Sequence, residues 1–168
     1  MFIDIDCSQK KKYNQNAYGD FFKSERFTDM NRLVAVLSDG LGSGIKADIL
    51  ACMTSTMLLK FLKENADIAV SDMEYFYEDS NERKYSSGGT FETTNCKKNP
   101  ELIAINNSAC NKLFKKELFQ DVEFPFRKYY EDLALIPILL YKAKAVSKVN
   151  KAFYYYRQRK GSIAHSAN

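Results

Sequence analysis

Two aspartates at predicted strand ends could bind a divalent metal ion. Asp39 follows the apolar run 33–37 and precedes Gly40, and Asp20 lies at the start of another predicted strand. Mg²⁺ and Mn²⁺ take oxygen ligands, and two carboxylates on neighbouring strands can bridge two ions that activate a water for attack on a phosphate ester. A plainer interpretation is an ordinary strand-to-helix turn in which Ser43 caps the helix.

A second acidic pair, Glu131 and Asp132, comes directly before an apolar stretch. The N-terminus of a helix keeps a carboxylate ionised, and in a sugar-transfer site such a carboxylate can take a proton from an acceptor hydroxyl. The pair could equally do no more than cap the helix. The chain therefore carries two candidate sites with different chemistry.

The elements that must position these residues follow from hydrophobic periodicity. Apolar residues at helical spacing predict a long helix over 45–64 and a second helix over 131–142, which Pro137 is expected to break or kink. A short strand that turns into a helix is expected over 109–119, while 101–106 is ambiguous between helix and strand. Strands are predicted over 2–6, 18–27, 32–38 (as a buried strand), 66–78, 85–94 and 146–157. This pattern indicates an α+β or α/β fold with a mixed β-sheet and two main helices.

The N-terminal part of the chain resembles the opening of a type 2C metal-dependent serine/threonine phosphatase domain, of the stage II sporulation protein E group. The matching residues are 18–20 (YGD), 36–47 (VLSDGLGSGIKA) and the helix that follows. The resemblance covers about residues 1–62. It implies that Asp20 and Asp39 bind metal, with Gly40 beside them and Mg²⁺ or Mn²⁺ as the cofactor. The further metal-binding aspartates that the family implies have no matching region that we recognise.

From about residue 65 the chain resembles the acceptor-side half of an inverting family 2 glycosyltransferase with the GT-A fold. The resemblance implies that Asp132 is the catalytic base, with Glu131 beside it. Asn111 and Lys112 would line or support the acceptor region, and Arg157 belongs to an aromatic strand that would border the active site. The matching segments are 66–70 (ADIAV), 109–119 (ACNKLFKKELF), 124–125 (FP), 130–133 (YEDL), 153–159 (FYYYRQR) and 161–163 (GSI).

The nucleotide-sugar half of that family, which holds a diphosphate through a metal bound to an Asp-x-Asp triplet, is not recognised. Asp4-Ile5-Asp6 spells such a triplet, but strand alternation within the phosphatase-like segment accounts for it. We therefore expect a hybrid of two partial domains, residues 1–63 and 64–168, in one compact fold.

The composition limits the classes of partner and cofactor that we expect. The 25 basic and 21 acidic residues give a net charge of only +4, without a concentrated basic face, so nucleic-acid binding is not expected. The four cysteines form no Cys-x-x-Cys pair and there is one histidine, so zinc is not expected either. No signal peptide and no apolar run of the ~20 residues that a span needs is recognised. A cytoplasmic location is expected.

Three functional hypotheses follow. The chain is glycosyltransferase-like with incomplete catalytic machinery, or a metal-dependent phosphatase-like protein, or a chimeric protein without catalysis. An active protein would take a nucleotide sugar or a phosphoprotein as substrate. A sheet edge left exposed by an incomplete domain would favour a homo-oligomer.

Overall fold

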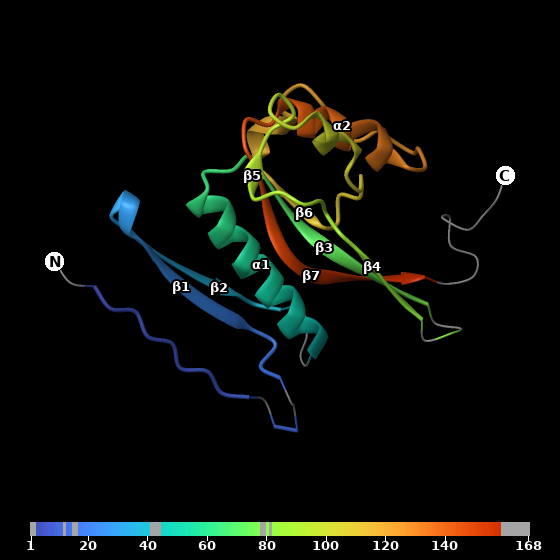
Figure 1. Ribbon diagram of the computed structural model, residues 1–168. Coiled ribbons are helices and arrows are strands. Elements are labelled where there is room, and N and C mark those ends of the chain that lie inside the picture. Colours follow the sequence, from blue (N-terminus) through green and yellow to red (C-terminus); the bar gives the residue numbers. More distant parts are fainter. Residues whose placement is uncertain are drawn as a thin grey trace. The chain divides into compact units, whose positions relative to one another are not determined.

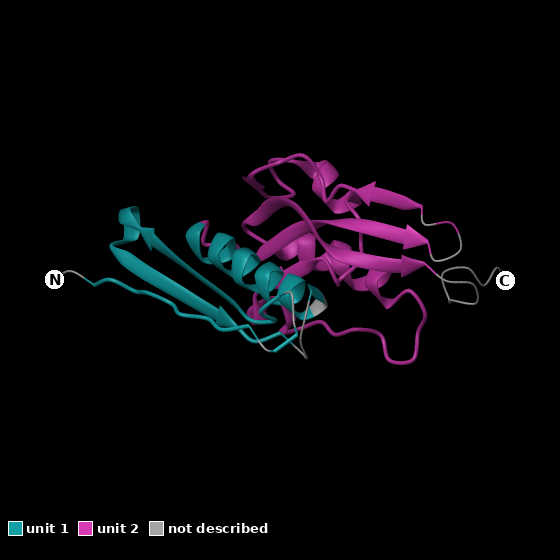
Figure 2. Cartoon of the chain, turned by 90° about the horizontal axis from the view of Figure 1, so that it is seen from below, with its two compact units in different colours: residues 1–63 teal, residues 64–168 magenta. Residues whose placement is uncertain are grey.

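The computed structural model describes residues 3–11, 13–14, 17–40, 45–77, 80 and 82–158 (Figure 1). The chain divides into two compact units, Met1–Lys63 and Glu64–Asn168 (Figure 2). Each unit has its own β-sheet and one main helix.

The first unit is an antiparallel hairpin with a helix packed on it. Strand β1 (Phe21–Phe27) pairs with β2 (Arg32–Ser38), and a short 3₁₀ helix (Thr28–Met30) connects them. Helix α1 (Ile45–Lys63) packs against both strands. The hydrophobic core of this unit is built from Phe27, Val36, Leu59, Val34 and Leu58.

The bounds predicted for β2 are confirmed, but the prediction that it is a buried strand is wrong. Only Val36 is buried, while Leu37 is 69% exposed. A helix covers one face of a two-stranded sheet, so alternate residues of β2 remain exposed.

The strand predicted over residues 2–6 does not form in its described part, 3–6. That segment instead runs antiparallel beside β1 and is held by side chains. The guanidinium of Arg26 donates to the Ile3 carbonyl at 2.8 Å, and the Gln9 amide donates to the Asp20 carbonyl at 3.1 Å.

The second unit contains a mixed five-stranded sheet. Its order is β4 (Arg83–Ser86), β3 (Ile68–Tyr77), β7 (Val146–Gln158) and β5 (Thr93–Thr94), with β6 (Lys112–Phe114) antiparallel to the start of β3. The two central strands β3 and β7 are parallel, and Ile68 lies opposite Val146. Parallel strands need a long crossover, and here the crossover carries helix α2 (Glu131–Lys142).

Helix α2 covers one face of this sheet (Figure 1). It packs Leu135, Ile136, Leu139 and Leu140 against residues of β3 and β7. The helix continues through Pro137, so the break predicted at this proline does not occur. The predicted strand 85–94 reduces to β4 and β5, and the ambiguous segment forms a 3₁₀ helix, Pro100–Ala104, as does Lys116–Phe119.

The structure confirms the expected α+β class, with mixed sheet pairing and two main helices. Among the described residues, no helix combines the length and the apolar character needed to cross a bilayer.

Candidate functional sites

A pocket of about 490 Å³ lies at the N-terminal end of α2 in the second unit. One wall is the loop 104–108, the other is the turn into α2, and Tyr156 comes from β7. The lining residues are Ala104, Ile105, Asn106, Asn107, Ser108, Tyr129, Tyr130, Glu131, Asp132, Leu133 and Tyr156. The pocket therefore combines two carboxylates, two amides and three phenol rings.

Asp132 is held in a defined position within this pocket. Its Oδ2 accepts the backbone N–H of Ala109 at 2.9 Å, and both Asp132 and Glu131 are half-buried. The partial positive charge of the helix N-terminus stabilises anions at this position. Tyr130, directly before α2, has φ of 57°, a left-handed conformation that costs energy for a residue with a Cβ. Such strain is found at functional sites more often than elsewhere.

Lys112 lies behind the pocket wall rather than in the lining. Its buried ammonium donates to the carbonyls of Asn106 and Ser108, at 2.5 and 2.7 Å, and to Asn111 Oδ1 at 2.8 Å. Burial lowers the pKa of Lys112 to about 8, although the nearby Asp132 carboxylate opposes that shift. The lysine therefore orders the loop that carries one wall of the pocket.

Asn111 connects this lysine to the central sheet. Its side-chain amide donates to the Ser71 carbonyl at 2.6 Å, and its own carbonyl accepts the Ser71 N–H at 2.9 Å. Asn111 is fully buried. Asn111 and Lys112 therefore support the wall of this pocket and do not line it.

Arg157 follows the pocket-lining Tyr156 on β7, and its side chain is exposed. Successive residues on a strand point to opposite faces, so Arg157 and Tyr156 belong to opposite faces of the sheet.

Sequence reasoning did not select the wall residues Asn106, Asn107 and Ser108. A run of three polar residues predicts a loop, but nothing in it indicates which pocket the loop borders.

The two aspartates of the first unit also come together. Asp20 precedes β1 and Asp39 follows β2. The neighbouring Asp20, by hydrogen bonding and by its charge, raises the pKa of Asp39. Antiparallel pairing explains the convergence, because Phe21 lies opposite Ser38.

Gly40 permits this approach of the two strand ends. A Cβ at Gly40 would lie 2.2 Å from the Gly19 carbonyl oxygen and 2.5 Å from that of Ala47. Gly19 has φ of 87°, which also favours glycine. The backbone around the aspartates is therefore built on two glycines in close contact.

A metal ion fits this acidic pair only in part. Asp20 and Asp39 offer oxygen ligands of the type that Mg²⁺ prefers, and Mg²⁺ commonly keeps several waters beside one or two carboxylates. Within the described part of the chain, no group of three or more acidic, histidine or cysteine side chains could surround an ion. The pair fits one hydrated ion.

No protein-family model matches the chain, and no curated protein matches it. Its function is therefore inferred from the residues and their arrangement.

Proposed function

We propose that residues 64–168 form a glycosyltransferase-like acceptor site of the inverting family 2 type. One observation carries this proposal. Asp132 stands in the pocket at the start of α2, with Oδ2 oriented by the Ala109 N–H. A carboxylate oriented in this way is suited to take the proton of a bound hydroxyl group.

The other lining residues suit a carbohydrate. Pockets that recognise polar ligands combine aromatic surfaces with a few placed polar groups, and here Tyr129, Tyr130 and Tyr156 supply rings beside two asparagines. Among the described residues, Asn107 Oδ1 is a buried acceptor without a hydrogen-bond partner. A ligand hydroxyl that donates to this oxygen would remove the cost of leaving it unsatisfied.

We assign acceptor binding to the chain rather than complete sugar transfer. The nucleotide-sugar half of the family is not recognised in the sequence, so Asp132 would have an acceptor to deprotonate but no anomeric carbon beside it. The purified protein should then bind a saccharide in this pocket without hydrolysing or transferring from a sugar nucleotide.

A glycan array probed with the purified protein tests this assignment. Glycans that bind the wild-type protein should bind at least about tenfold more weakly to Asp132→Asn, since one charge-assisted hydrogen bond is lost. Asp121→Asn is the matched control, because the Asp121 side chain is 87% exposed and pairs loosely with Lys142 at 3.8 Å. Failure of every glycan to bind, or equal binding by Asp132→Asn, would contradict the proposal. Turnover of a sugar nucleotide would show that the site is complete.

The convergence of Asp20 and Asp39 favours a second candidate, a metal-dependent phosphatase-like site in the first unit. These carboxylates would hold Mg²⁺ or Mn²⁺, which in such a site supplies an activated water. Addition of MnCl₂ should raise the melting temperature of the wild-type protein but not that of Asp20→Asn or Asp39→Asn. Absence of both a glycan ligand and a manganese response would leave the non-catalytic chimera as the supported hypothesis.

A further inference from the structure

The pocket at the start of α2 has a negatively charged lining. Its charged residues are Glu131 and Asp132, and among the described residues no lysine or arginine belongs to the lining. Within the described part of the chain, neither carboxylate forms an ion pair with a cation. A cleft lined by charges of one sign attracts ligands of the opposite sign. The charge of the lining therefore favours a cationic ligand.

The cations nearest to this pocket are engaged elsewhere. Lys112 lies behind the wall and is attracted by Asp132, but its ammonium donates to three protein oxygens and has no N–H left for a ligand. The Arg127 guanidinium lies 5.0 Å from the centre of the Phe126 ring, and Lys128 is exposed and outside the lining. One buried ammonium thus stands against two carboxylates, and the pocket keeps a net negative charge.

Three phenol rings in the same lining also favour a cation. Tyr129 and Tyr130 come from the turn before α2, and Tyr156 comes from β7. The ring of Tyr156 is held in place by Tyr75 and Tyr154, whose ring centres are 5.4 and 6.1 Å away. The face of an aromatic ring attracts an ammonium group, and proteins that recognise such groups surround them with aromatic side chains.

The uncharged polar groups of the wall favour a ligand that donates hydrogen bonds. The side chain of Asn106 is already used at both ends, since its amide donates to the Tyr75 hydroxyl at 3.1 Å and its oxygen accepts the Ser108 N–H at 2.8 Å. Asn107 Oδ1 is a buried acceptor without a hydrogen-bond partner among the described residues. An ammonium group has three donors and no acceptor. A carboxylate or phosphate group would bring only acceptors to a pocket that already holds acceptors.

We propose that the saccharide bound in this pocket is an amino sugar whose free ammonium group contacts Glu131 and the tyrosine rings. The inference rests on the proposed acceptor site and goes further by naming the class of acceptor. Asp132, oriented by the Ala109 N–H, is left to accept the proton of a neighbouring hydroxyl group. A neutral sugar lacks the charge that the lining attracts, and a uronate or sugar phosphate is repelled by it.

Isothermal titration calorimetry with three tetrasaccharides of the same β-1,4-linked backbone tests this inference at pH 6. At each C2 position cellotetraose has a hydroxyl group, chitosan tetraose an ammonium group and chitin tetraose an N-acetyl group. Chitosan tetraose should bind the wild-type protein at least about tenfold more tightly than either of the others. This preference should shrink as NaCl is raised from 50 to 500 mM, because salt screens the attraction. The whole chain has a net charge of +4, which opposes unspecific binding of a cation.

Isosteric variants locate the ammonium group. Glu131→Gln should lower the preference for chitosan tetraose about fivefold or more and leave the affinity for cellotetraose unchanged. Glu123→Gln, the same substitution at an exposed residue outside the lining, should keep the full preference. Tyr129→Leu should weaken the binding of chitosan tetraose about two- to fivefold, whereas Tyr129→Phe, which keeps the ring, should not. Tyr129 is 74% exposed, so neither substitution disturbs the core.

Two results would overturn the amino-sugar inference and leave the proposed acceptor site intact. The first is equal affinity for cellotetraose and chitosan tetraose, with both lost in Asp132→Asn. The second is a preference for chitosan tetraose that Glu131→Gln and Glu123→Gln leave equally unchanged, which would assign the cation to another surface. If no tetrasaccharide and no glycan of the array binds, the proposed acceptor site fails, and this inference fails with it. The circular dichroism spectrum and melting temperature of each variant verify that it is folded.

Discussion

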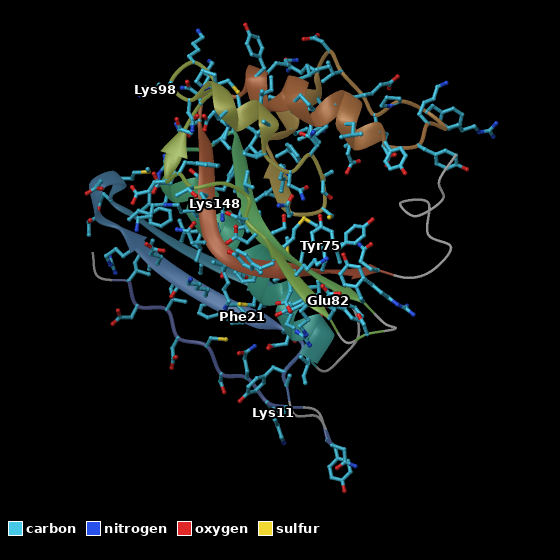
Figure 3. The ribbon with its side chains drawn as sticks, turned by 45° about the vertical axis from the view of Figure 1, so that its right-hand side comes forward. Lys11, Phe21, Tyr75, Glu82, Lys98 and Lys148 are labelled. Carbon is cyan, nitrogen blue, oxygen red and sulfur yellow. The ribbon has the colours of Figure 1, made fainter. Side chains whose placement is uncertain are left out.

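The ammonium of Lys148 lies 2.5 Å from the carboxylate of Asp72, and these side chains are only 1% and 3% exposed. Lys148 projects from β7 (Figure 3), and Asp72 from the neighbouring β3. Asp72 also accepts the Tyr85 hydroxyl and the Gly88 N–H, the latter at 2.8 Å. Burial by itself would raise the pKa of Asp72, but the hydrogen bonds from Lys148, Tyr85 and Gly88 outweigh it and hold the pKa below its usual value.

Removal of Lys148 should destabilise the second unit strongly. Lys148→Met leaves the Asp72 carboxylate buried without its cation, which should lower the free energy of unfolding by about 3–5 kcal/mol. Urea unfolding followed by circular dichroism of the backbone measures this loss in the free energy of unfolding. Lys115→Met is the control, because Lys115 is 46% exposed and 3.6 Å from Asp67, and it should cost less than about 1 kcal/mol. Equal effects of the two substitutions would contradict the assigned importance of burial.

The pH dependence of stability should report Lys112. Its pKa is about 8 in the folded protein, against 10.5 for the free side chain. Between these values the unfolded state binds the additional proton, so this group makes the folded state more stable as pH rises from 8 towards 10.5, by up to about 3 kcal/mol. Below pH 8 both states are protonated and the contribution is constant.

The measurement compares urea unfolding at pH 7.5, 8.5 and 9.5 for wild-type protein and Lys112→Met. The difference between the two isolates Lys112, because Cys96 and Tyr85, whose pKa values are raised, change stability in the opposite direction. Lys98→Met, on an exposed side chain, should keep the wild-type profile. A constant difference between wild type and Lys112→Met over this range would contradict the lowered pKa.

The sequence predicts the elements better than it predicts their burial. The spacing of apolar residues predicts the bounds of α1 to within one residue, and the bounds that it predicts for α2 are those observed. Both helices can be predicted because each presents a continuous apolar stripe to a sheet. The buried character expected for β2 fails, since burial depends on whether a second layer covers the outer face. Periodicity within one strand carries no information about that layer.

The candidate sites divide in the same way. Asp132 can be selected from its place before an apolar helix, and Asp39 from its place after an apolar strand. The pocket wall at Asn107 and Ser108 cannot be selected, because it depends on Lys112 holding backbone carbonyls four to six residues back in the chain. A lysine that binds carbonyls leaves no signature in a sequence.

Gly40 should be intolerant of even one methyl group. A Cβ at 2.2 Å from the Gly19 carbonyl oxygen and 2.5 Å from that of Ala47 meets backbone atoms, which cannot rotate away. Gly40→Ala should therefore lower the free energy of unfolding of the first unit by about 2 kcal/mol or more. Asp39→Ala, at the adjacent exposed position, is the control and should not destabilise. Thermal unfolding distinguishes them, and an unchanged melting temperature for Gly40→Ala would contradict this packing.

The pKa of Asp39 should stay raised as long as Asp20 is present. Hydrogen bonding to Asp20 and the repulsion between the two carboxylates raise the pKa of Asp39 in the folded protein. The folded state then binds the proton more tightly than the unfolded state, so the favourable contribution is present at low pH and is lost as pH rises through the raised pKa. Carbon-detected NMR of the Asp39 carboxyl group measures this titration directly. Asp20→Asn should return the pKa of Asp39 towards its ordinary value, whereas Asp29→Asn, in the hairpin turn, should leave it raised. An Asp39 titration that does not respond to Asp20→Asn would mean that the two carboxyl groups do not meet.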